Sequence, residues 1–468
     1  FANPLPAVAI HQPTYPSWDE VEQARQNEAA AAAKIEEIEG ILIRLYAEAA
    51  ELNEIAMQLA EEYAREADRR FHAQTNCCPD CGPSVALLDR EGRQLAGDDP
   101  IRACIRLLKQ GHILAIKGIG GYHLCCNALD GAAVAELRLR KRRPDRPLAV
   151  MAKDLPAVKR VCEVSAAEAA ALSGNKKPIV LLNKIAGFVL PANIAPAQRT
   201  LGIMLPYAPL HELLFEDGLE YLVMTSGNAS GMPICYRDDD ALRELKEVAD
   251  YFLTHNREIR VPVDDSVVRV AEGAELVSRC GRGYAPAAFP MHTEYNIIAL
   301  GAEQKASVAI LGNGCGLLSQ YLGDLQAYDA FLTYQHVLSH LQSIAGVSRP
   351  VFAHDGNPDY LSTQFAQDQA GRKIAVQHHH AHVASCMAEH GLAREVIGVV
   401  YDGTGLGSDG AVWGGEFFVS TRRASKRAAH WQYVALQGGD LAVRQPWRCA
   451  ACYLKAAGLD ASRMLSSV

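Results

Sequence analysis

The sequence lacks any long hydrophobic run. No apolar stretch among the 468 residues approaches the roughly 20 that a membrane-spanning helix needs, and the N-terminus lacks the basic and then apolar pattern of a signal peptide. We therefore expect no membrane segment and a cytoplasmic location. The sequence also has no excess of basic residues. It contains 46 Lys and Arg and 54 Asp and Glu, which gives a net charge of -8. Nucleic acid is not an expected partner, and any site for a polyanion has to be local.

A disulfide framework is not expected either. Thirteen cysteines, an odd number, are scattered along the chain with many in apolar surroundings, as is typical of reduced thiols. Hydrophobic residues at 49% and charged residues at 21% are typical of a globular protein, and 468 residues predict two or three domains. The chain begins with Phe1 and ends directly after a helical pattern, so we expect both ends to be cut ends.

A glycine-rich turn and a dense group of cations stand on one predicted strand-turn-helix-strand unit, residues 113–151. The apolar run 113–116 predicts a buried strand, and the glycines after it allow a sharp turn and a close approach to a ligand. The helix predicted over 131–139 is followed by a cluster of cations: Arg138, Arg140, Lys141, Arg142, Arg143 and Arg146. So many cations repel one another unless an anion neutralises them, which favours a phosphate site over a solvated helix end.

The rest of residues 98–288 is typical of an α/β domain. Further strands are predicted at 148–151, 179–182, 221–224 and 267–270, and helices at 101–110 and 239–253. The loop after 221–224 offers hydroxyl and amide groups that suit phosphate or ribose, with an ordinary polar turn as the alternative: Thr225, Ser226, Asn228 and Ser230. Five charged residues then follow that could equally form a structural ion-pair network: Arg257, Asp264, Asp265, Arg279 and Arg282.

Four histidines stand within the five positions 378–382. His378 and His382 are four residues apart, so on a helix they share one face at a separation that suits a metal. The apolar strand predicted over 396–400 leads to Asp402, which is followed by several glycines. Two nitrogen ligands and one oxygen ligand leave positions open, which indicates a catalytic metal, either zinc or iron.

The N-terminal part predicts a long helix behind a proline-rich tail, residues 1–16. Ser17 and Glu20 form a capping box, and apolar residues then recur in alternating steps of three and four. This heptad seam consists of Ile35, Ile38, Leu42, Leu45, Ala49, Leu52, Ala56, Leu59 and Tyr63. We expect residues 17–70 to form an amphipathic helix, or a helical hairpin bent at Gly40, with a structural role or a role in self-association.

Residues 71–92 contain a possible zinc knuckle. Cys78 and Cys81 form a C-x-x-C pair beside Cys77, but a closed structural zinc site needs four ligands and no second pair follows at a suitable spacing. The sequence therefore predicts a zinc-ribbon-like remnant that is empty rather than occupied.

Several of these segments resemble HypF-type carbamoyltransferases, the maturation enzymes of [NiFe] hydrogenases. The YrdC-like domain of that family is similar to KGIGGYHL at 117–124, RKRRPDRPLAVM at 140–151, TSGNASGMPI at 225–234 and SRCGRGYAP at 278–286. Its actin-like, Kae-type domain is similar to IIALGAEQKASVAIL at 297–311, HDGNPDYLST at 354–363, QHHHAHVASC at 377–386 and YDGTGLG at 401–407. The resemblance implies an α/β fold in two parts, residues 98–288 and 295–468, after the helical segment.

The resemblance also implies the chemistry. Carbamoyl phosphate or carbamate and ATP, with Mg²⁺, would give carbamoyl-adenylate, and the carbamoyl group would pass to the C-terminal cysteine of HypE. Lys141, Arg143 and Arg146 would hold the phosphates, with Arg146 standing where the family has lysine. The other nucleotide-binding residues implied are Lys117, Gly118, Gly120, Gly121, Thr225, Ser226, Asn228, Ser230, Arg257, Arg279, Gly403, Thr404 and Gly405. The metal ligands implied are His378, His382 and Asp402, with Cys78 and Cys81 as a weaker zinc pair.

Besides Arg146, the chain departs from the family pattern in three places. Nothing in residues 1–68 resembles the acylphosphatase domain, and Asn357 stands where the family has histidine. We also expect the actin-like domain to stop before its second lobe, which in the family supplies a further acidic metal ligand. Two alternatives therefore stay open: a threonylcarbamoyl-adenylate synthase or O-carbamoyltransferase acting on tRNA or a small molecule, and an inactive binding or assembly fragment.

Overall fold

The structure is a computed structural model. It describes residues 17–65, 82–95, 97, 99–228, 232–291, 293–439, 441–442 and 445–460. The expectations for Cys78, Cys81 and Ser230 lie outside these residues. The chain divides into two compact units, residues 1–84 and 85–468, which are described separately. Among the described residues, no helix is both long and apolar enough to cross a membrane.

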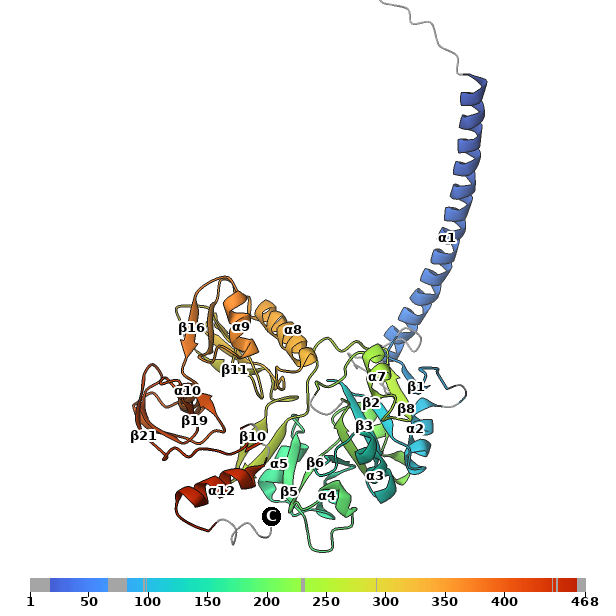
Figure 1. The fold of residues 1–468 in the computed structure, drawn as a ribbon. Helices are drawn as coiled ribbons and strands as arrows, with labels where there is room; N and C mark the ends of the chain where they lie inside the picture. The colour runs from blue at the N-terminus through green and yellow to red at the C-terminus, as the bar shows by residue number, and fades with distance from the viewer. Residues whose placement is uncertain are drawn as a thin grey trace, which may run out of the picture. The chain divides into compact units, whose positions relative to one another are not determined.

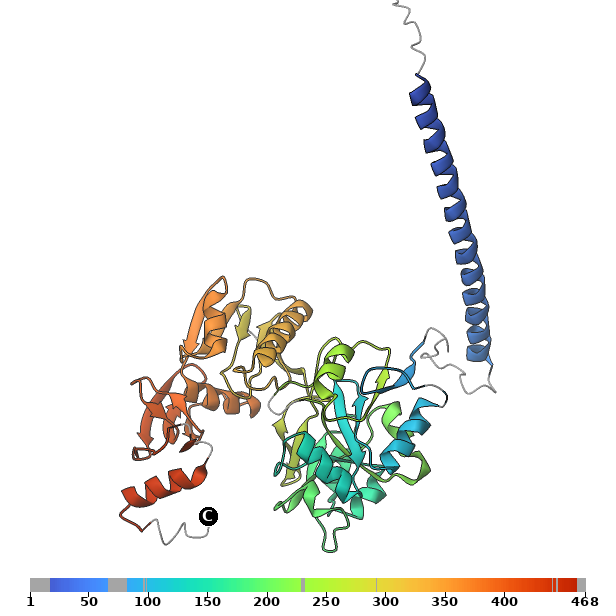
Figure 2. The ribbon, with the colours of Figure 1, turned by 45° about the vertical axis from the view of Figure 1, so that its right-hand side comes forward.

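The described residues of the first unit contain one helix, α1, from Trp18 to Ala64. It is continuous over 47 residues (Figures 1 and 2), so the helix predicted after Ser17 is confirmed and the hairpin bent at Gly40 is wrong. A lone glycine costs a helix only about 1 kcal/mol relative to alanine. The neighbours Glu39 and Ile41 offer no turn chemistry, so Gly40 does not interrupt the helix.

The second unit begins with a mixed sheet of ten strands in the order β1-β8-β2-β3-β7-β4-β6-β5-β9-β10. The strands are β1 (Val85–Asp89), β2 (Leu114–Lys117), β3 (Tyr122–Asn127), β4 (Val150–Ala152), β5 (Ile179–Asn183), β6 (Thr200–Met204), β7 (Tyr221–Ser226), β8 (Tyr251–His255), β9 (Val267–Ala271) and β10 (Ala274–Arg279). Each of the five strands predicted from apolar runs is found, with ends shifted by at most two residues. The pairs β2 with β8, β4 with β6 and β5 with β9 are parallel, and the other pairs are antiparallel.

Helices cover both faces of this sheet (Figure 1). They are α2 (Pro100–Lys109), α3 (Gly131–Arg140), α4 (Leu155–Lys159), α5 (Ala166–Ser173), α6 (Pro209–Leu213) and α7 (Asp238–Leu245), with the short 3-10 turns η1 (Ala192–Ile194) and η2 (Glu216–Gly218). Successive side chains of β2 point to opposite faces of the sheet and pack in two separate hydrophobic cores. Ala115 lies in one core, and Leu114 and Ile116 lie in the other. The helix predicted over 239–253 is wrong in its second half, because α7 ends at Leu245 and the apolar residues from Tyr251 form β8 between β1 and β2.

The remainder of the second unit contains a six-stranded sheet in the order β11-β14-β13-β12-β15-β16. Its strands are β11 (Ala287–Pro290), β12 (Ile297–Ala299), β13 (Ala309–Gly312), β14 (Cys315–Leu318), β15 (Val351–Asp355) and β16 (Lys373–Val376), with helices α8 (Tyr328–Ala345) and α9 (Leu361–Asp368). The helix α10 (His378–Glu389) follows, and then β17 (Val396–Val400), β20 (Glu416–Ser420) and β21 (Ser425–His430) form a second sheet. A small ribbon, β18 (Gly405–Leu406) with β19 (Val412–Trp413), and α12 (Pro446–Ala456) complete the described part.

The glycine-rich turn between β2 and β3 packs directly against the backbone of residues 262–265. The amide of Val263 donates to the carbonyl oxygen of Gly120 at 2.9 Å. A Cβ atom added at Gly120 would lie 2.3 Å from the carbonyl oxygen of Val263, which is far inside van der Waals contact. The close approach that this glycine permits is therefore to another segment of the protein.

We expect Gly120→Ala to lower the free energy of unfolding by about 1–3 kcal/mol, the usual cost of overpacking, because the backbone at Val263 has to move. Thermal unfolding measures the change. Gly356→Ala is the matched control, since its new methyl would meet nothing closer than 3.8 Å. Equal melting temperatures for the two variants would contradict this account of the turn.

Candidate functional site

A cavity of about 380 Å³ brings together seven of the predicted nucleotide-binding residues. It is lined by Lys141, Arg143, Arg146, Thr225, Ser226, Asn228 and Arg279. Residues 321–324, which precede α8, close another side of it. The cationic segment after α3, the end of β7 and the end of β10 therefore meet at one place, although Lys141 in the first and Arg279 in the last are 138 residues apart in the sequence.

Several predicted residues do not line this cavity. Lys117 is buried, and its Nζ lies 2.7 Å from the carboxylate of Asp238 and donates to the carbonyl oxygen of His255 at 3.0 Å. The remaining predicted residues outside it are Gly118, Gly120, Gly121, Arg257, Gly403, Thr404 and Gly405. A nucleotide-binding role for these residues stays a prediction.

Lys141 is the most deeply buried cation of the cavity, with 5% of its surface exposed. Its Nζ donates to the carbonyl oxygen of Ser226, to that of Asn228 at 3.0 Å and to Oδ1 of Asn228 at 2.9 Å. Burial, together with the nearby Arg143, lowers the pKa of this amine to about 7. Lys141 thus joins the end of α3 to the polar loop after β7. Its amine can gain or lose a proton near neutral pH.

Arg143 is the cation with the clearest capacity for a ligand. Its Nη2 donates to the carbonyl oxygen of Pro147 at 2.9 Å, but its buried Nε has no hydrogen-bond partner among the described residues. Burial, followed by repulsion from Arg146 and Arg138, lowers the pKa of this guanidinium. An anion in the cavity would satisfy the unpaired nitrogen and offset the repulsion, and a phosphate group has the oxygens to do both.

Two of the other cations in the cluster have structural partners. The guanidinium of Arg138 donates to the carbonyl oxygens of Arg143 at 2.8 Å, Pro144 at 2.9 Å and Arg146 at 3.1 Å. Arg140 pairs with Asp250 at 2.8 Å. Only part of the cluster is therefore free for an anion, and Arg138 holds the loop from which Arg143 and Arg146 extend.

The adjacent residues Asp264 and Asp265 both line the cavity but have different environments. Asp265 accepts from Nε2 of His123 at 2.9 Å and from Nε of Arg282 at 2.8 Å, and all three side chains are buried. Burial raises the pKa of Asp265, but His123 and Arg282 outweigh it and hold the pKa well below its usual value. Burial raises the pKa of Asp264. The ion-pair network considered as the alternative for Asp265 is present, and His123, which the sequence reading did not single out, is part of it.

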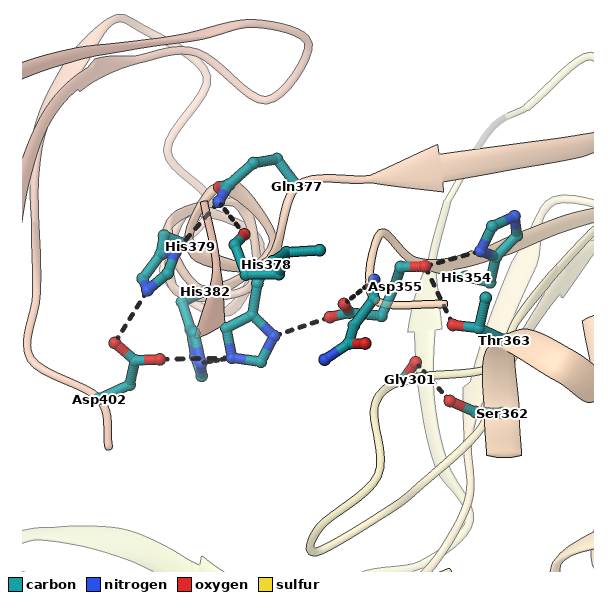
Figure 3. A network of polar contacts seen from close by, with 12 residues as sticks. Gly301, His354, Asp355, Ser362, Thr363, Gln377, His378, His379, His382 and Asp402 are labelled. Carbon is teal, nitrogen blue, oxygen red and sulfur yellow. Dashed lines mark hydrogen bonds and ion pairs between the residues drawn. The ribbon is translucent and has the colours of Figure 1, made fainter. Parts of the chain in front are cut away.

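A second group of polar side chains lies where α10 meets β17 (Figure 3). The predicted ligands His378, His382 and Asp402 offer ligand atoms that all lie within 4.8 Å of one another, and among the described residues they form the one group with this property. Nε2 of His378 lies 3.3 Å from Nε2 of His382 and 3.3 Å from Oδ2 of Asp402. The i, i+4 spacing on α10 and the position of Asp402 just after β17 produce this arrangement, as predicted.

Two further residues complete the group. Oδ2 of Asp355, at the end of β15, lies 2.7 Å from Nδ1 of His378, and this contact leaves Nε2 of His378 directed toward His382 and Asp402 (Figure 3). The bonds with Asp355 and Asp402 outweigh burial and raise the pKa of His378 to about 9. Nε2 of the fully buried His379 lies 3.2 Å from Oδ1 of Asp402. The sequence reading missed Asp355, although it follows His354 at the end of an apolar run that predicts a strand.

The donor set fits a cation. Both carboxylate oxygens of Asp402 are buried and form no hydrogen bond of good geometry with a described residue. Burial opposes the ionisation of Asp402, but His378 and His379 hold its pKa well below the usual value. The distances from Nε2 of His378 to Nε2 of His382 and to Oδ2 of Asp402, both 3.3 Å, match those between ligands of a tetrahedral ion with bonds of about 2.0–2.1 Å. Two imidazoles and one carboxylate suit zinc or iron, and the exposed His382 leaves one side open.

Four family models match the chain. They are the HypF finger at 60–88, the Sua5/YciO/YrdC model described as telomere recombination at 106–281, the HypF Kae1-like domain at 292–389, and the second subdomain of the carbamoyltransferase Kae1-like domain at 398–467. The last match assigns residues 398–467 to the second subdomain of that domain. The expectation of a truncated actin-like domain stays a prediction. The finger model covers the predicted zinc-ribbon-like segment with Cys78 and Cys81, and the expectation that this segment is empty of zinc stays a prediction.

Curated relatives agree with these matches. The carbamoyltransferase HypF of Synechocystis is 43% identical over 374 residues, which is 79% of this chain and 49% of the relative. That of Rhodobacter capsulatus is 43% identical over 413 residues, which is 85% of this chain and 54% of the relative. The chain thus spans about half the length of the curated relatives it matches.

Solved structures show the same fold. A crystal structure of full-length HypF in its phosphate- and nucleotide-bound form is 44% identical, with a TM-score of 0.79 over 85% of this chain and 52% of that one. HypF of T. kodakarensis is 40% identical, also with a TM-score of 0.79, over 85% of this chain and 53% of that one. The predicted fold class, a YrdC-like α/β part followed by a Kae1-like α/β part, is confirmed.

We expect Asp355→Asn to weaken zinc binding at His378, His382 and Asp402 by about 10–100-fold, the usual effect of removing a partner that orients a ligand. The neutral amide cannot hold the His378 ring as the carboxylate does. Competition with a chelating dye measures the affinity. Asp359→Asn, an exposed position four residues along, should leave it unchanged. Equal affinities in all three proteins would show that Asp355 has no part in the site.

Proposed function

The chain belongs to the HypF family, and from that premise we propose that it is an ATP-dependent carbamoyltransferase. In this proposal it forms carbamoyl-adenylate from ATP and from carbamate or carbamoyl phosphate. It then transfers the carbamoyl group to the C-terminal cysteine of a HypE-like acceptor protein. The observation that supports this most strongly is the cavity that joins Lys141, Arg143 and Arg279, in which a buried guanidinium nitrogen has no partner among the described residues.

The first half-reaction needs no nucleophile from the protein. A carbamate oxygen attacks the α-phosphorus of ATP, a new P–O bond forms, and pyrophosphate leaves with Mg²⁺. Negative charge spreads over the phosphate oxygens in the transition state, so fixed cations at that position lower the barrier. Lys141, Arg143 and Arg146 line the cavity, and hydrogen bonds to backbone carbonyl oxygens hold Lys141 and Arg143 before the ligand arrives.

In the second half-reaction the acceptor thiolate attacks the carbamoyl carbon. A C–S bond forms, the C–O bond to the adenylate breaks, AMP leaves, and the proton of the thiol has passed to solvent. A zinc or iron ion bound by His378, His382 and Asp402 would act as a Lewis acid that polarises the carbamoyl group. Asp355 fixes the His378 ring, and His379 fixes Asp402, so the ligand atoms are already arranged.

A second candidate rests on the match of residues 106–281 to the Sua5/YciO/YrdC model. Under this reading threonine and bicarbonate condense to a carbamate with loss of water, the carbamate oxygen attacks the α-phosphorus of ATP, pyrophosphate leaves, and the product is threonylcarbamoyl-adenylate. The two candidates share ATP and the release of pyrophosphate, and they differ in the small substrate that makes this release possible.

The experiment is ATP–pyrophosphate exchange, compared with transfer of the carbamoyl group to a peptide that ends in cysteine. We expect exchange with carbamate and slower transfer, because the cationic residues line a shaped cavity whereas His382 is exposed and leaves the metal group open to water. Exchange with threonine and bicarbonate alone would favour the second candidate. No exchange with either substrate would support a non-catalytic assembly role. Transfer as fast as exchange would contradict the expected order of the rates.

Site variants make this test specific. Arg143→Ala should weaken ATP binding by about 1.5–3 kcal/mol, the scale of a charge-assisted contact, and should reduce exchange accordingly. Lys153→Ala removes one exposed cation outside the cavity and should change neither. Calorimetry measures ATP affinity directly. If Arg143→Ala binds ATP with unchanged affinity, the cavity is not the ATP site.

We also expect ATP binding to take up a proton on Lys141. The amine of the free protein has a pKa of about 7, and the phosphates raise that pKa in the complex, so affinity should fall as pH rises from about 7 to 9. Calorimetry in buffers with different ionisation enthalpies counts the protons. In Lys141→Arg the side chain stays charged at every pH, so the proton uptake should disappear. The same uptake in that variant would assign the proton to another group.

A further inference from the structure

Helix α1 carries a line of large apolar side chains that is open to solvent. Ile35, Ile38, Leu42 and Leu45 are 57%, 49%, 46% and 53% exposed. The line continues through the exposed Ala49. Contiguous exposed apolar surface of this kind marks an interaction site in most proteins. A helix of 47 residues also gains most of its stability from packing, which makes a partner for this face an energetic requirement.

The spacing of the line identifies the kind of partner. Steps of three and four residues alternate from Ile35 to Tyr63, an average period of 3.5 residues. This period keeps the line straight only when the helix winds around another helix with the same repeat, because 3.6 residues per turn would otherwise rotate it away. Every copy of this chain supplies such a helix. In a dimer with two-fold symmetry both copies use the same surface, so the apolar line of one helix packs on the apolar line of the other.

The residues beside the line favour a parallel pair in register. With Ile35 and Ile38 as the first two inward positions, Lys34 of one helix faces Glu39 of the other, and the opposite charges attract on both sides of the pair. Ile41 and Tyr46, 41% and 74% exposed, face each other in the same way and extend the apolar contact. In an antiparallel pair Lys34 and Glu39 would lie in different places and would not meet.

We propose that α1 is the dimerisation element of this protein and that two copies join through a parallel coiled coil along Ile35, Ile38, Leu42 and Leu45. The proposal is independent of the carbamoyltransferase reaction. The inward positions combine Ile and Leu with the smaller Ala49 and Ala56, which suits close packing of two helices.

Sedimentation of the full chain over a concentration series tests the proposal. The wild-type protein should approach twice its mass of 50.7 kDa, and Leu42→Glu should sediment as a monomer. Ile43→Glu is the matched control: it places the same charge on the next residue, which is 70% exposed and lies off the line, so this variant should stay dimeric. A monomeric wild-type chain, as would follow if the line packed within its own chain, overturns the proposal. A dimer that survives Leu42→Glu overturns it as well.

A charge exchange tests the parallel arrangement without placing a charge in the apolar line. Lys34→Glu and Glu39→Lys should each weaken the dimer several-fold, because each leaves like charges facing each other. The double variant should restore the wild-type dissociation constant, since the pair is rebuilt with its signs reversed. Circular dichroism of each variant confirms that the helix is retained. If the double variant loses as much free energy of dimerisation as the two single variants together, the parallel pairing in this register is ruled out.

Discussion

The buried ion pairs of Asp265 are the interaction on which the cavity beside Lys141 and Arg143 depends. One carboxylate holds His123 of β3 and Arg282, while Arg282 also donates to the carbonyl oxygens of Lys176 and Lys177 before β5. The guanidinium of Arg282 lies 3.4 Å from the ring of Tyr207 as well. Removing charges from water is costly, and only a network in which the charges are fully bonded recovers that cost. Its geometry therefore allows little variation, and the neighbouring Asp264 is fixed at the cavity wall.

The two sites of the second unit are built by the same rule with different chemistry. In both, a side chain from one element receives its orientation from another element far away in the sequence. Lys141 at the end of α3 is held by the loop after β7, and His378 at the start of α10 is held by Asp355 at the end of β15. The ends of strands and both ends of helices thus supply the chemical groups, and contacts between elements orient them. Substitutions on the protein surface should therefore disturb these sites less than substitutions of the residues that orient Lys141 and His378.

Local patterns in the sequence were enough to find much of this arrangement. The pairing of His378 with His382 follows from helical spacing, and the apolar runs located five strands of the first sheet. Contacts over long distances in the chain are not accessible in this way, so His123, which lies 142 residues before Asp265, is not predicted. The strand that ends at Asp355 has a local pattern, but the contact of Asp355 with His378 has none. The short apolar run at Tyr251 was assigned to a helix because only its position between β1 and β2 makes it a strand. A single glycine was given too much weight at Gly40.

Arg138 has a consequence for the thermodynamics of ligand binding. Its bonds to the carbonyl oxygens of Arg143, Pro144 and Arg146 order this loop when the protein folds, before any ligand is present. The conformational entropy of the loop is therefore lost once, on folding, and is not lost again when a phosphate compound enters. Lysine at this position could not replace the planar fork, since it presents a single point charge. A ligand that entered the cavity would therefore meet Arg143 and Arg146 on a backbone that is already ordered.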